Sequence, residues 1–323
     1  MIRADMERRT QWLRDAGFGL AVHWTSYSLP ESPTDADIGR PYEKRIADYI
    51  KATEDFDVKG FTDQVIATGA RFLIFTLAHA DMVLPLPLPE LDEIVAGHTA
   101  RRDLVLEIAD ILEKNGIKLI LYFNPDGPCD PDWQNAVSFK EDPKTHAEFV
   151  YRVVGAIAKR YGKRISGWWI DDCYDTHVLT VANRGLGHRY DYKRFGEVLR
   201  SGNPDAILAF NFSGAVCEWQ SELGANVADY QGGEENWLHR SPMGSFSGEG
   251  GTQWFGFCWM DDFWVHEKAG VPTPRFSDDE VLAYIERVKR CGGAFAYNAA
   301  IYREGRISEP TVKQLLWLRD KGI

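Results

Sequence analysis

DLVLEIADILEKNGIKLILYFN (103–124) carries the clearest structural signal in the chain. In its first part, Leu and Ile recur every three or four residues and a glycine follows, which predicts an amphipathic helix with a glycine cap. In its last part, IKLILYFN (117–124), the short apolar run is typical of a buried strand. RFLIFTLAH (71–79) has the same character and precedes the helix. A strand, a helix and a strand in this order predict a parallel sheet covered by helices.

The same alternation continues in both directions along the chain. Further strands are predicted at FGLAVHW (18–24), SGWWIDD (166–172), AILAFNFS (206–213), VADYQ (227–231), WFGFCWM (254–260) and AFAYNAA (294–300). Eight strands about 40 residues apart, in one strand–helix order, predict an α/β fold: a single (β/α)8 TIM-type barrel domain over residues 1–323. The helix between the fifth and sixth strands is poorly marked and no clear helix precedes the seventh, so we expect irregularity around strands 5–7.

The composition excludes several classes of protein. The chain has 37 Lys and Arg against 48 Asp and Glu, a net charge of −11, which disfavours nucleic acid as a partner. No apolar run is long enough to span a membrane or to act as a signal peptide. The five cysteines lie far apart and form no C-x-x-C pair, which favours a cytoplasmic protein without disulfides or a zinc knuckle. The oligomeric state is left open.

Polar residues follow almost every predicted strand, where the catalytic groups of a barrel enzyme lie. A single polar residue at such a place is usually structural, but eight strand ends together favour a polar pocket. These strand-end residues are His23, Trp24, His79, Asn124, Asp171, Asp172, Asn211, Glu234, Asp261, Asp262 and Asn298.

Carboxylates are the most informative of these residues. Asp171 follows an apolar strand and shares a face with Trp169, so we expect it to project into the barrel mouth beside an indole. A glycosidase requires a second carboxyl group. Spacing alone leaves five candidates for it: Glu218, Glu222, Glu234, Glu235 and Asp261.

Other chemistries find less support in the sequence. A metal-dependent hydrolase on this fold needs clustered metal ligands, typically an H-x-H pair on the first strand. Here Trp24 and Thr25 follow His23, so no such pair forms. His79 and Asp81 are a weak possibility for two ligands. No phosphate loop, dinucleotide-binding glycine pattern or G-x-S-x-G motif occurs. The sequence therefore predicts no metal and no cofactor.

Five segments are similar to motifs that occur together in one family. WLRDAGFGLAVHWTSYSLP (12–30) is similar to W-F-x-x-x-K-F-G-I-F-x-H-W-G-x-Y-S-V-P, and ATGARFLIFTLAHAD (67–81) to A-G-A-K-Y-x-x-x-T-x-K-H-H-D. GWWIDD (167–172) is similar to a W-F-D-G segment, and ADYQGGEE (228–235) to D-Y-x-T-P-E. Residues 278–307 are similar to a stretch ending V-S-K-G-G-N-L-L-L-N-V-G-P-x-x-D-G-x-I. Together they resemble the retaining α-L-fucosidases, glycoside hydrolase family 29.

This resemblance implies roles for individual residues. It places the nucleophile on Asp171 and the acid/base on Glu234, with His23 and His79 bonded to sugar hydroxyls. The remaining substrate-binding residues that we predict are Trp24, Trp169, Asn211, Trp259 and Trp264. The substrate implied is a small-molecule glycoside or an oligosaccharide.

The chain also departs from the family pattern. The His-His pair becomes His79-Ala80, the T-P before the acid/base becomes Gly232-Gly233, and W-G-Y becomes Phe263-Trp264-Val265. The carboxy-terminal β-sandwich that is common in the family is not expected here. These changes bear on fucose as the sugar more than on glycoside hydrolysis. The two glycines are expected to loosen the loop that aims Glu234.

The main hypothesis is therefore a retaining exo-glycosidase, α-L-fucosidase-like. It requires carboxyl groups about 5–5.5 Å apart, and we expect Glu235 to turn toward solvent or an Arg partner. One alternative is a catalytically weak sugar-binding protein on the same barrel. The other is a metal-dependent TIM-barrel hydrolase, which a chelator would inactivate.

Overall fold

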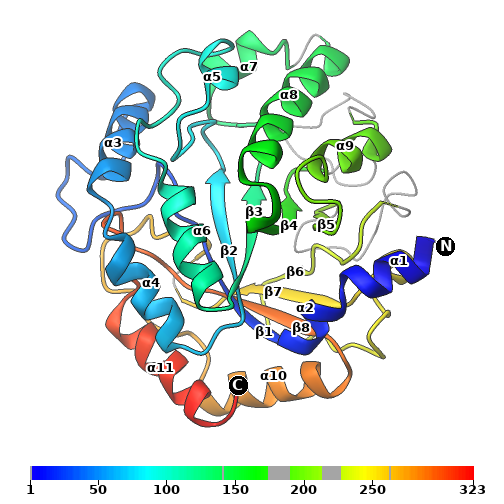
Figure 1. Cartoon of the computed structure of the whole chain (residues 1–323). Coiled ribbons are helices and arrows are strands. Elements are labelled where there is room, and N and C mark those ends of the chain that lie inside the picture. Colours follow the sequence, from blue (N-terminus) through cyan, green and yellow to red (C-terminus); the bar gives the residue numbers. More distant parts are fainter. Residues whose placement is uncertain (1, 140–141, 174–189, 213–226, 262) are drawn as a thin grey trace.

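Eight parallel strands form the centre of the computed structural model, which describes residues 2–139, 142–173, 190–212, 227–261 and 263–323 (Figure 1). Their order in the sheet is β5-β4-β3-β2-β1-β8-β7-β6. The predicted (β/α)8-type barrel is thus confirmed. The strands are β1 (Phe18–Val22), β2 (Phe72–Ala78), β3 (Lys118–Phe123), β4 (Ile165–Ile170), β5 (Ile207–Phe210), β6 (Glu234–Glu235), β7 (Phe255–Trp259) and β8 (Ala294–Asn298).

The sixth strand differs from the prediction. It comprises Glu234–Glu235, whereas 227–231 holds only an isolated bridge between Tyr230 and Gln253. The backbone amide of Asp229 nevertheless donates to the Leu208 carbonyl of β5 at 2.8 Å, and that of Gln253 donates to Asp229 at 3.0 Å. The segment before β6 therefore bridges the gap between the two ends of the sheet, and the expected irregularity around strands 5–7 is present.

Helices surround the strands (Figure 1). Several begin at the acidic or hydroxyl caps that the sequence offers: Asp57, Asp103 and Asp191 each accept a backbone N–H of the first turn, and Ser277 with Glu280 forms a capping box. Between β6 and β7 the described residues contain only the short 3-10 turn η3 (Glu249–Gly251). The segment between β5 and β6 includes 213–226, outside the described residues. The other helices are α1 (Ile2–Arg9), α2 (Gln11–Ala16), α3 (Tyr42–Asp55), α4 (Val58–Ala67), α5 (Pro89–Asp92), α6 (Leu104–Lys114), α7 (Pro131–Ala136), α8 (Pro143–Tyr161), η1 (Gly162–Arg164), α9 (Tyr192–Leu199), α10 (Asp278–Arg290) and α11 (Glu309–Asp320).

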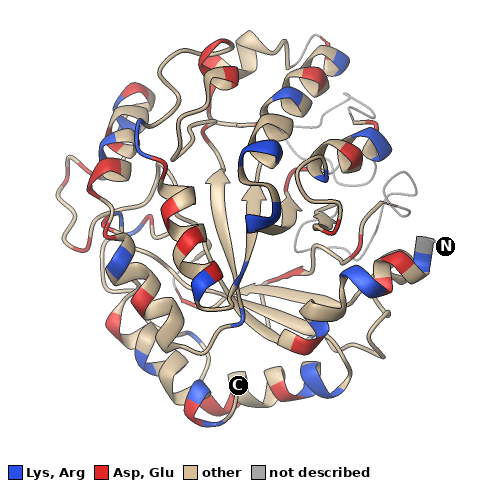
Figure 2. Cartoon of the chain, in the orientation of Figure 1, with Lys and Arg blue, Asp and Glu red and all other residues tan. Residues whose placement is uncertain are grey.

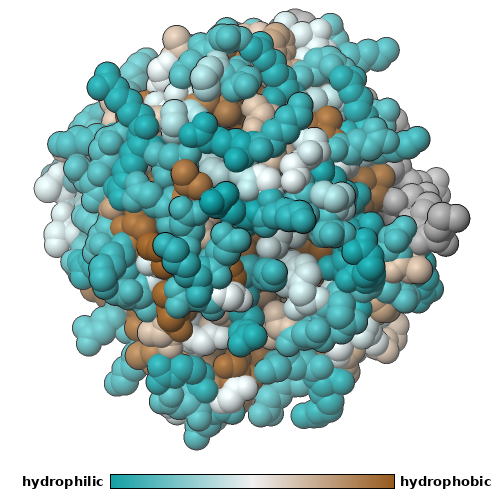
Figure 3. All heavy atoms as spheres, in the orientation of Figure 1, coloured by the Kyte–Doolittle hydropathy of each residue, from teal (hydrophilic) through white to brown (hydrophobic). Residues whose placement is uncertain are grey.

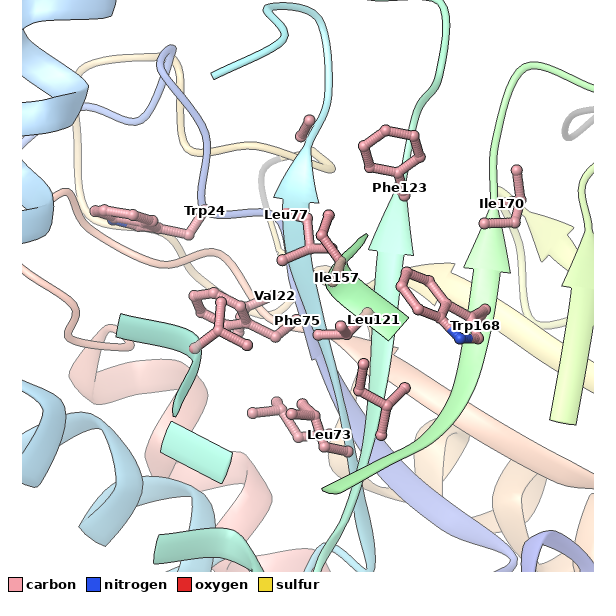
Figure 4. Close-up of a cluster of buried hydrophobic side chains, with 14 of the residues drawn as sticks. Val22, Trp24, Leu73, Phe75, Leu77, Leu121, Phe123, Ile157, Trp168 and Ile170 are labelled. Atoms are coloured by element: carbon pink, nitrogen blue, oxygen red, sulfur yellow. The ribbon is translucent and has the colours of Figure 1, made fainter. Parts of the chain in front are cut away.

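Two apolar clusters fill the molecule, one on each face of the sheet. The larger lies between strands and helices and includes Leu73, Trp168 and, from α8, Ile157 (Figure 4). The smaller fills the barrel interior and includes Ile74 and Trp169. Because side chains alternate along a strand, residues two positions beyond an interior residue also face inward. This alternation directs Asp171, two residues after Trp169, toward the barrel mouth.

The outer surface is polar. Lys, Arg, Asp and Glu are spread over the helices, while the central strands carry almost none (Figure 2), and hydrophilic side chains cover most of the face seen in Figure 3. Among the described residues, no helix is both long and apolar enough to cross a membrane.

Candidate active site

A pocket of about 90 Å³ opens among side chains from the carboxyl ends of the strands. It combines two carboxyl groups, two imidazoles and four larger aromatic rings. Strands on both sides of the barrel contribute to it. The residues around it are His23, His79, Tyr122, Trp169, Asp171, Glu234, Phe257 and Trp264.

One amide group connects the two carboxyl groups. Asn211 Nδ2 donates to Asp171 Oδ1 at 2.9 Å and to Glu234 Oε2 at 2.7 Å. The phenol of Tyr122 donates to Asp171 Oδ2. Because one nitrogen reaches both acids, these two oxygens cannot lie farther apart than the sum of the two bond lengths. The shared amide thus brings the two acids together at the pocket, as the paired carboxyl groups of a glycosidase require.

Gly232 and Gly233, directly before Glu234, position its side chain in the pocket. Gly233 has φ of 69°, and a Cβ at this position would lie 2.1 Å from the Phe255 carbonyl oxygen. The Gly232 carbonyl accepts a 2.9 Å bond from Trp169 Nε1, and the Phe257 amide donates to the Gly233 carbonyl at 2.8 Å. The expectation of a loosened loop is therefore wrong, because the absence of side chains lets this segment pack tightly against β4 and β7.

The environment of Glu234 favours its protonated form. Burial, with a further contribution from the Asp171 carboxylate, raises the pKa of Glu234 to about 8, although the bond from Asn211 acts in the opposite direction. Glu234 is thus a neutral acid near pH 7 beside Asp171. Such a pair, with one proton available, suits general acid catalysis.

Both histidines are neutral. Burial lowers the pKa of His23 to about 3 and also lowers that of His79. Asn298 Nδ2 donates to the Trp264 carbonyl at 3.0 Å, so its Oδ1 must accept the 2.7 Å bond from His23 Nδ1. The other nitrogen of His23 is left as an acceptor. His79 Nδ1 is buried and has no hydrogen-bond partner within the described part of the chain.

Of the four tryptophans predicted to wall the pocket, Trp169 and Trp264 line it. Trp24 does not. It lies in the outer cluster (Figure 4), contacts Tyr49 and Phe56, and donates from Nε1 to the Arg303 carbonyl at 3.0 Å. The prediction for Trp24 is wrong because it follows His23 directly, and neighbouring side chains of an extended segment point to opposite faces.

Trp259 lies at the rim of the barrel and does not line the pocket. It ends β7, and its Nε1 donates to Asn236 Oδ1 at 2.9 Å. The prediction that Trp259 lines the pocket is therefore wrong. Trp259 lies two residues beyond the pocket residue Phe257, one layer nearer the mouth of the barrel.

Replacing Trp24 with phenylalanine tests this position of the side chain. We expect KM for the substrate to stay unchanged and the free energy of unfolding to fall by about 2 kcal/mol, because a buried hydrogen bond and part of a packed ring are lost. Thermal unfolding and steady-state kinetics on the same preparation measure both. A raised KM with unchanged stability would place Trp24 back in the pocket.

The other candidate acids divide into two groups. Asp261 accepts from the Ala300 amide and the Thr311 hydroxyl, both at 2.7 Å, so both of its oxygens serve the fold. Glu235 is buried with its carboxylate toward Tyr284 of α10, whose hydroxyl donates to it. Its expected turn toward solvent is thus wrong, although the Arg240 charge lies near it. Glu218 and Glu222 lie outside the described residues.

Within the described part of the chain, the pocket holds neither a cluster of metal ligands nor a Lys or Arg side chain. Among the described residues, no three His, Cys, Asp or Glu side chains are placed to hold a metal ion. Asp81, the weak partner predicted for His79, instead forms a bidentate ion pair with Arg45, with both distances 2.9 Å. Arg40 and Arg303 are paired with Asp48 and Asp37.

The comparisons with known proteins agree with this geometry. The model of the alpha-L-fucosidase family matches residues 3–318. The chain belongs to the α-L-fucosidase family. It is therefore a glycosidase, as the sequence motifs indicate. No curated protein matches it in sequence.

Solved structures of this fold include several α-L-fucosidases. Isoenzyme 1 from Paenibacillus thiaminolyticus superposes with a TM-score of 0.70 at 18% identity, over 98% of this chain and 77% of that one. AlfC from Lactobacillus casei, in complex with its α-L-fucose product, gives 0.67 at 17% identity, over 97% and 99% of the two chains. The endo-fucoidan hydrolase P5AFcnA of glycoside hydrolase family 107 gives 0.68 at 14% identity, over 97% and 92%. At these identities the likeness shows the fold alone.

Two pocket residues of this family member were not predicted from the sequence. Tyr122 and Phe257 lie inside strands, two residues before the strand-end residues Asn124 and Trp259. The period of two along a strand relates Tyr122 to Asn124, and it relates Phe257 to Asp261 by two steps through Trp259. Asn124 itself lies outside the pocket and donates to Asp172 Oδ2 at 2.7 Å.

Proposed function

We propose that the protein is a retaining exo-α-L-fucosidase in which Asp171 is the nucleophile and Glu234 the acid/base. The observation that carries this proposal is the single Asn211 amide bonded to both carboxyl groups. It holds the two acids close enough for one to attack the anomeric carbon while the other reaches the glycosidic oxygen. Family membership supports fucose as the sugar.

The reaction would take two steps. In the first, an Asp171 oxygen bonds to the anomeric carbon, the glycosidic bond breaks, and its oxygen takes the proton of Glu234. In the second, the Glu234 carboxylate removes a proton from water, the water oxygen bonds to the anomeric carbon, and Asp171 is released. Hydrogen bonds from Tyr122 and Asn211 hold the Asp171 carboxylate in position throughout.

The remaining pocket groups suit one sugar ring. His23 offers an acceptor nitrogen, and His79 Nδ1 has no hydrogen-bond partner among the described residues. Both nitrogens can form hydrogen bonds with sugar hydroxyl groups. Trp169, Phe257 and Trp264 supply apolar surface for the carbon skeleton. Arg40, Arg45 and Arg303 are engaged in ion pairs outside the pocket, which favours a neutral sugar over a sulfated or uronic one.

A panel of 4-nitrophenyl glycosides tests the function. The α-L-fucoside should be hydrolysed fastest. Hydrolysis of another glycoside instead would show that the substrate sugar is not fucose. Sugar binding in calorimetry without hydrolysis of any glycoside would favour the alternative of a sugar-binding protein. The tight packing at Gly232-Gly233 weakens that alternative, because a loosely held acid/base would slow hydrolysis without preventing sugar binding.

The pH dependence of kcat/KM follows from the protonation of Glu234. The first step needs the protonated acid, and the raised pKa of about 8 means that the proton is lost only as pH rises through that value. We therefore expect kcat/KM for a fucoside with a poor leaving group to be lost on the alkaline side, about ten-fold per pH unit above the pKa. The Glu234→Gln variant should lack this alkaline decline. Persistence of the same decline in the variant would assign it to another group.

We also propose a domain organisation, a class of partner and a location for the protein. Residues 1–323 would act as one catalytic domain on a small-molecule glycoside or oligosaccharide, with no nucleic acid partner, in keeping with the net charge of −11. The scattered cysteines, without a paired motif, support a cytoplasmic location.

A further inference from the structure

The chain leaves β4 through a bulge that contains Asp171. The Asn211 amide donates to the Ile170 carbonyl at 2.8 Å, and the Cys173 amide donates to the Asn211 carbonyl at 3.2 Å. In a regular parallel ladder the second bond would come from the amide of residue 172, so the β4 side holds one extra residue between the two bonds. Asp171 and Asp172 therefore lie together opposite Asn211.

This bulge places an unusual backbone conformation at Asp172. Its φ is 50°, which glycine adopts freely and most other residues avoid. The W-F-D-G segment to which GWWIDD (167–172) is similar has glycine at this place. A residue with a side chain keeps such a conformation only when its surroundings hold it there.

The end of β3 holds the bulge. Tyr122 lies in β3 and Asn124 directly follows that strand, so the two are two residues apart and share a face. The Tyr122 hydroxyl donates to Asp171 Oδ2, and Asn124 Nδ2 donates to Asp172 Oδ2 at 2.7 Å. Consecutive side chains of a regular strand point to opposite faces. One face of the β3 segment therefore reaches both carboxylates only because the bulge turns them to the same side.

Asn124 is itself firmly placed. It is buried, and its amide donates to the Ala78 carbonyl of β2 at 3.1 Å. Its Oδ1 accepts the Asp126 amide at 3.0 Å, which leaves Nδ2 as the atom that faces Asp172. The bond between the two side chains thus has a defined donor and a defined acceptor.

We propose that Asn124 and Asp172 are positioning residues for the nucleophile. This inference rests on the proposed function of Asp171. The bond between the two side chains holds the positive φ of residue 172, and with it the bulge that aims the Asp171 carboxylate at the anomeric carbon. Neither side chain lines the pocket, so both act through the backbone of Asp171. A displacement of about 1 Å at a reacting group costs about a hundred-fold in rate, so the bond should affect kcat rather than KM.

Exchanging the two partners tests the bond itself. Asn124→Asp sets a carboxylate against that of Asp172 while keeping an oxygen for the Asp126 amide. On the 4-nitrophenyl glycoside that the wild type cleaves fastest, we expect kcat to fall about a hundred-fold, with KM changed less than about three-fold. In the double variant that combines Asn124→Asp with Asp172→Asn, the amide stands on the other side and donates to the carboxylate. Its kcat should return to within about five-fold of wild type.

Two substitutions at Asp172 test the conformation separately. This residue is partly exposed, so both variants leave the core intact. Asp172→Ala loses the acceptor and also the tolerance of positive φ, and its kcat should fall about ten-fold. Asp172→Gly loses only the acceptor, so its kcat should fall clearly less.

Asn203→Asp is the matched control at the other end of β4. Asn203 Nδ2 donates to the Ile165 carbonyl at 2.8 Å and its Oδ1 accepts the Asp205 amide at 3.1 Å, an arrangement close to that of Asn124. The same chemical change far from the bulge should leave kcat unchanged, whatever it does to the temperature of unfolding.

The outcomes separate this inference from the proposed function. Wild-type kcat in Asn124→Asp, or a double variant as slow as the single one, would overturn the positioning role and leave the hydrolase standing. If Asn124→Asp does not fold, wild-type kcat in Asp172→Ala would overturn the role in the same way. A wild-type chain that cleaves no 4-nitrophenyl glycoside would overturn the proposed function, and the positioning role with it.

Discussion

The Asp171→Ala variant is expected to lose roughly three or more orders of magnitude in kcat on 4-nitrophenyl α-L-fucoside. Without the carboxylate no covalent glycosyl-enzyme intermediate can form, and the Asn211 and Tyr122 donors face an empty space. Azide should restore part of the rate, because a small anion fits where the carboxylate was and attacks the anomeric carbon itself. The product is then the inverted glycosyl azide, which chromatography against a standard identifies.

The neighbouring Asp172→Asn variant is the control for this change. Asp172 has φ of 50°, a backbone conformation that asparagine tolerates, and its Oδ2 accepts the bond from Asn124 Nδ2. An asparagine oxygen can accept the same bond, so activity should stay within a few-fold of wild type. If instead Asp171→Ala kept its rate while Asp172→Asn lost it, the nucleophile would be misassigned by one residue.

The second large effect is expected at Glu234. The Glu234→Gln variant loses the proton donor but keeps an oxygen for the Asn211 bond, so kcat/KM on fucosyl disaccharides should fall roughly 10²- to 10⁴-fold. On α-L-fucosyl fluoride the loss should be much smaller, because fluoride needs little help from an acid to leave. The ratio of the two effects measures general acid catalysis directly.

Glu235→Gln supplies the same chemical change one residue away. Burial raises the pKa of Glu235 to about 7, but its carboxylate faces the Tyr284 hydroxyl on the outer side of the barrel. Glutamine can still accept that bond, so both substrates should be cleaved at near the wild-type rate. Similar losses in the Glu234→Gln and Glu235→Gln variants would point to damage to β6 rather than to a missing acid.

Alternation in the sequence predicted most of the barrel. The strand at 71–79 and the helix and strand at 103–124 lie where expected, because their apolar periods agree with the layers that bury them. The interior direction of Asp171 followed from its two-residue spacing to Trp169. Trp24 follows the strand-end residue His23 directly, but the two neighbouring side chains face opposite sides, so only His23 lines the pocket.

The acid/base region could not be derived from local pattern. β6 has two residues, and its position depends on Gly233 approaching the Phe255 carbonyl, a contact between segments that periodicity does not describe. The Asn211 bridge joins residues of β6 to the ends of β4 and β5, which come together only because the sheet curls until its two ends approach. Spacing in the sequence leaves five candidates for the second carboxyl group, and only the resemblance to the family motif selects Glu234.

The most direct test of the account is to identify the residue that bonds to the sugar. A 2-deoxy-2-fluoro-α-L-fucosyl fluoride should inactivate the enzyme, because the 2-fluoro group slows both steps by destabilising the oxocarbenium-like transition state, and the fluoride leaving group keeps the first step the faster. Peptide mass spectrometry after digestion should then find one added fluorofucosyl group on Asp171. A label on any other carboxylate, or turnover of substrate without any labelled peptide, would contradict the assignment of Asp171 as the nucleophile.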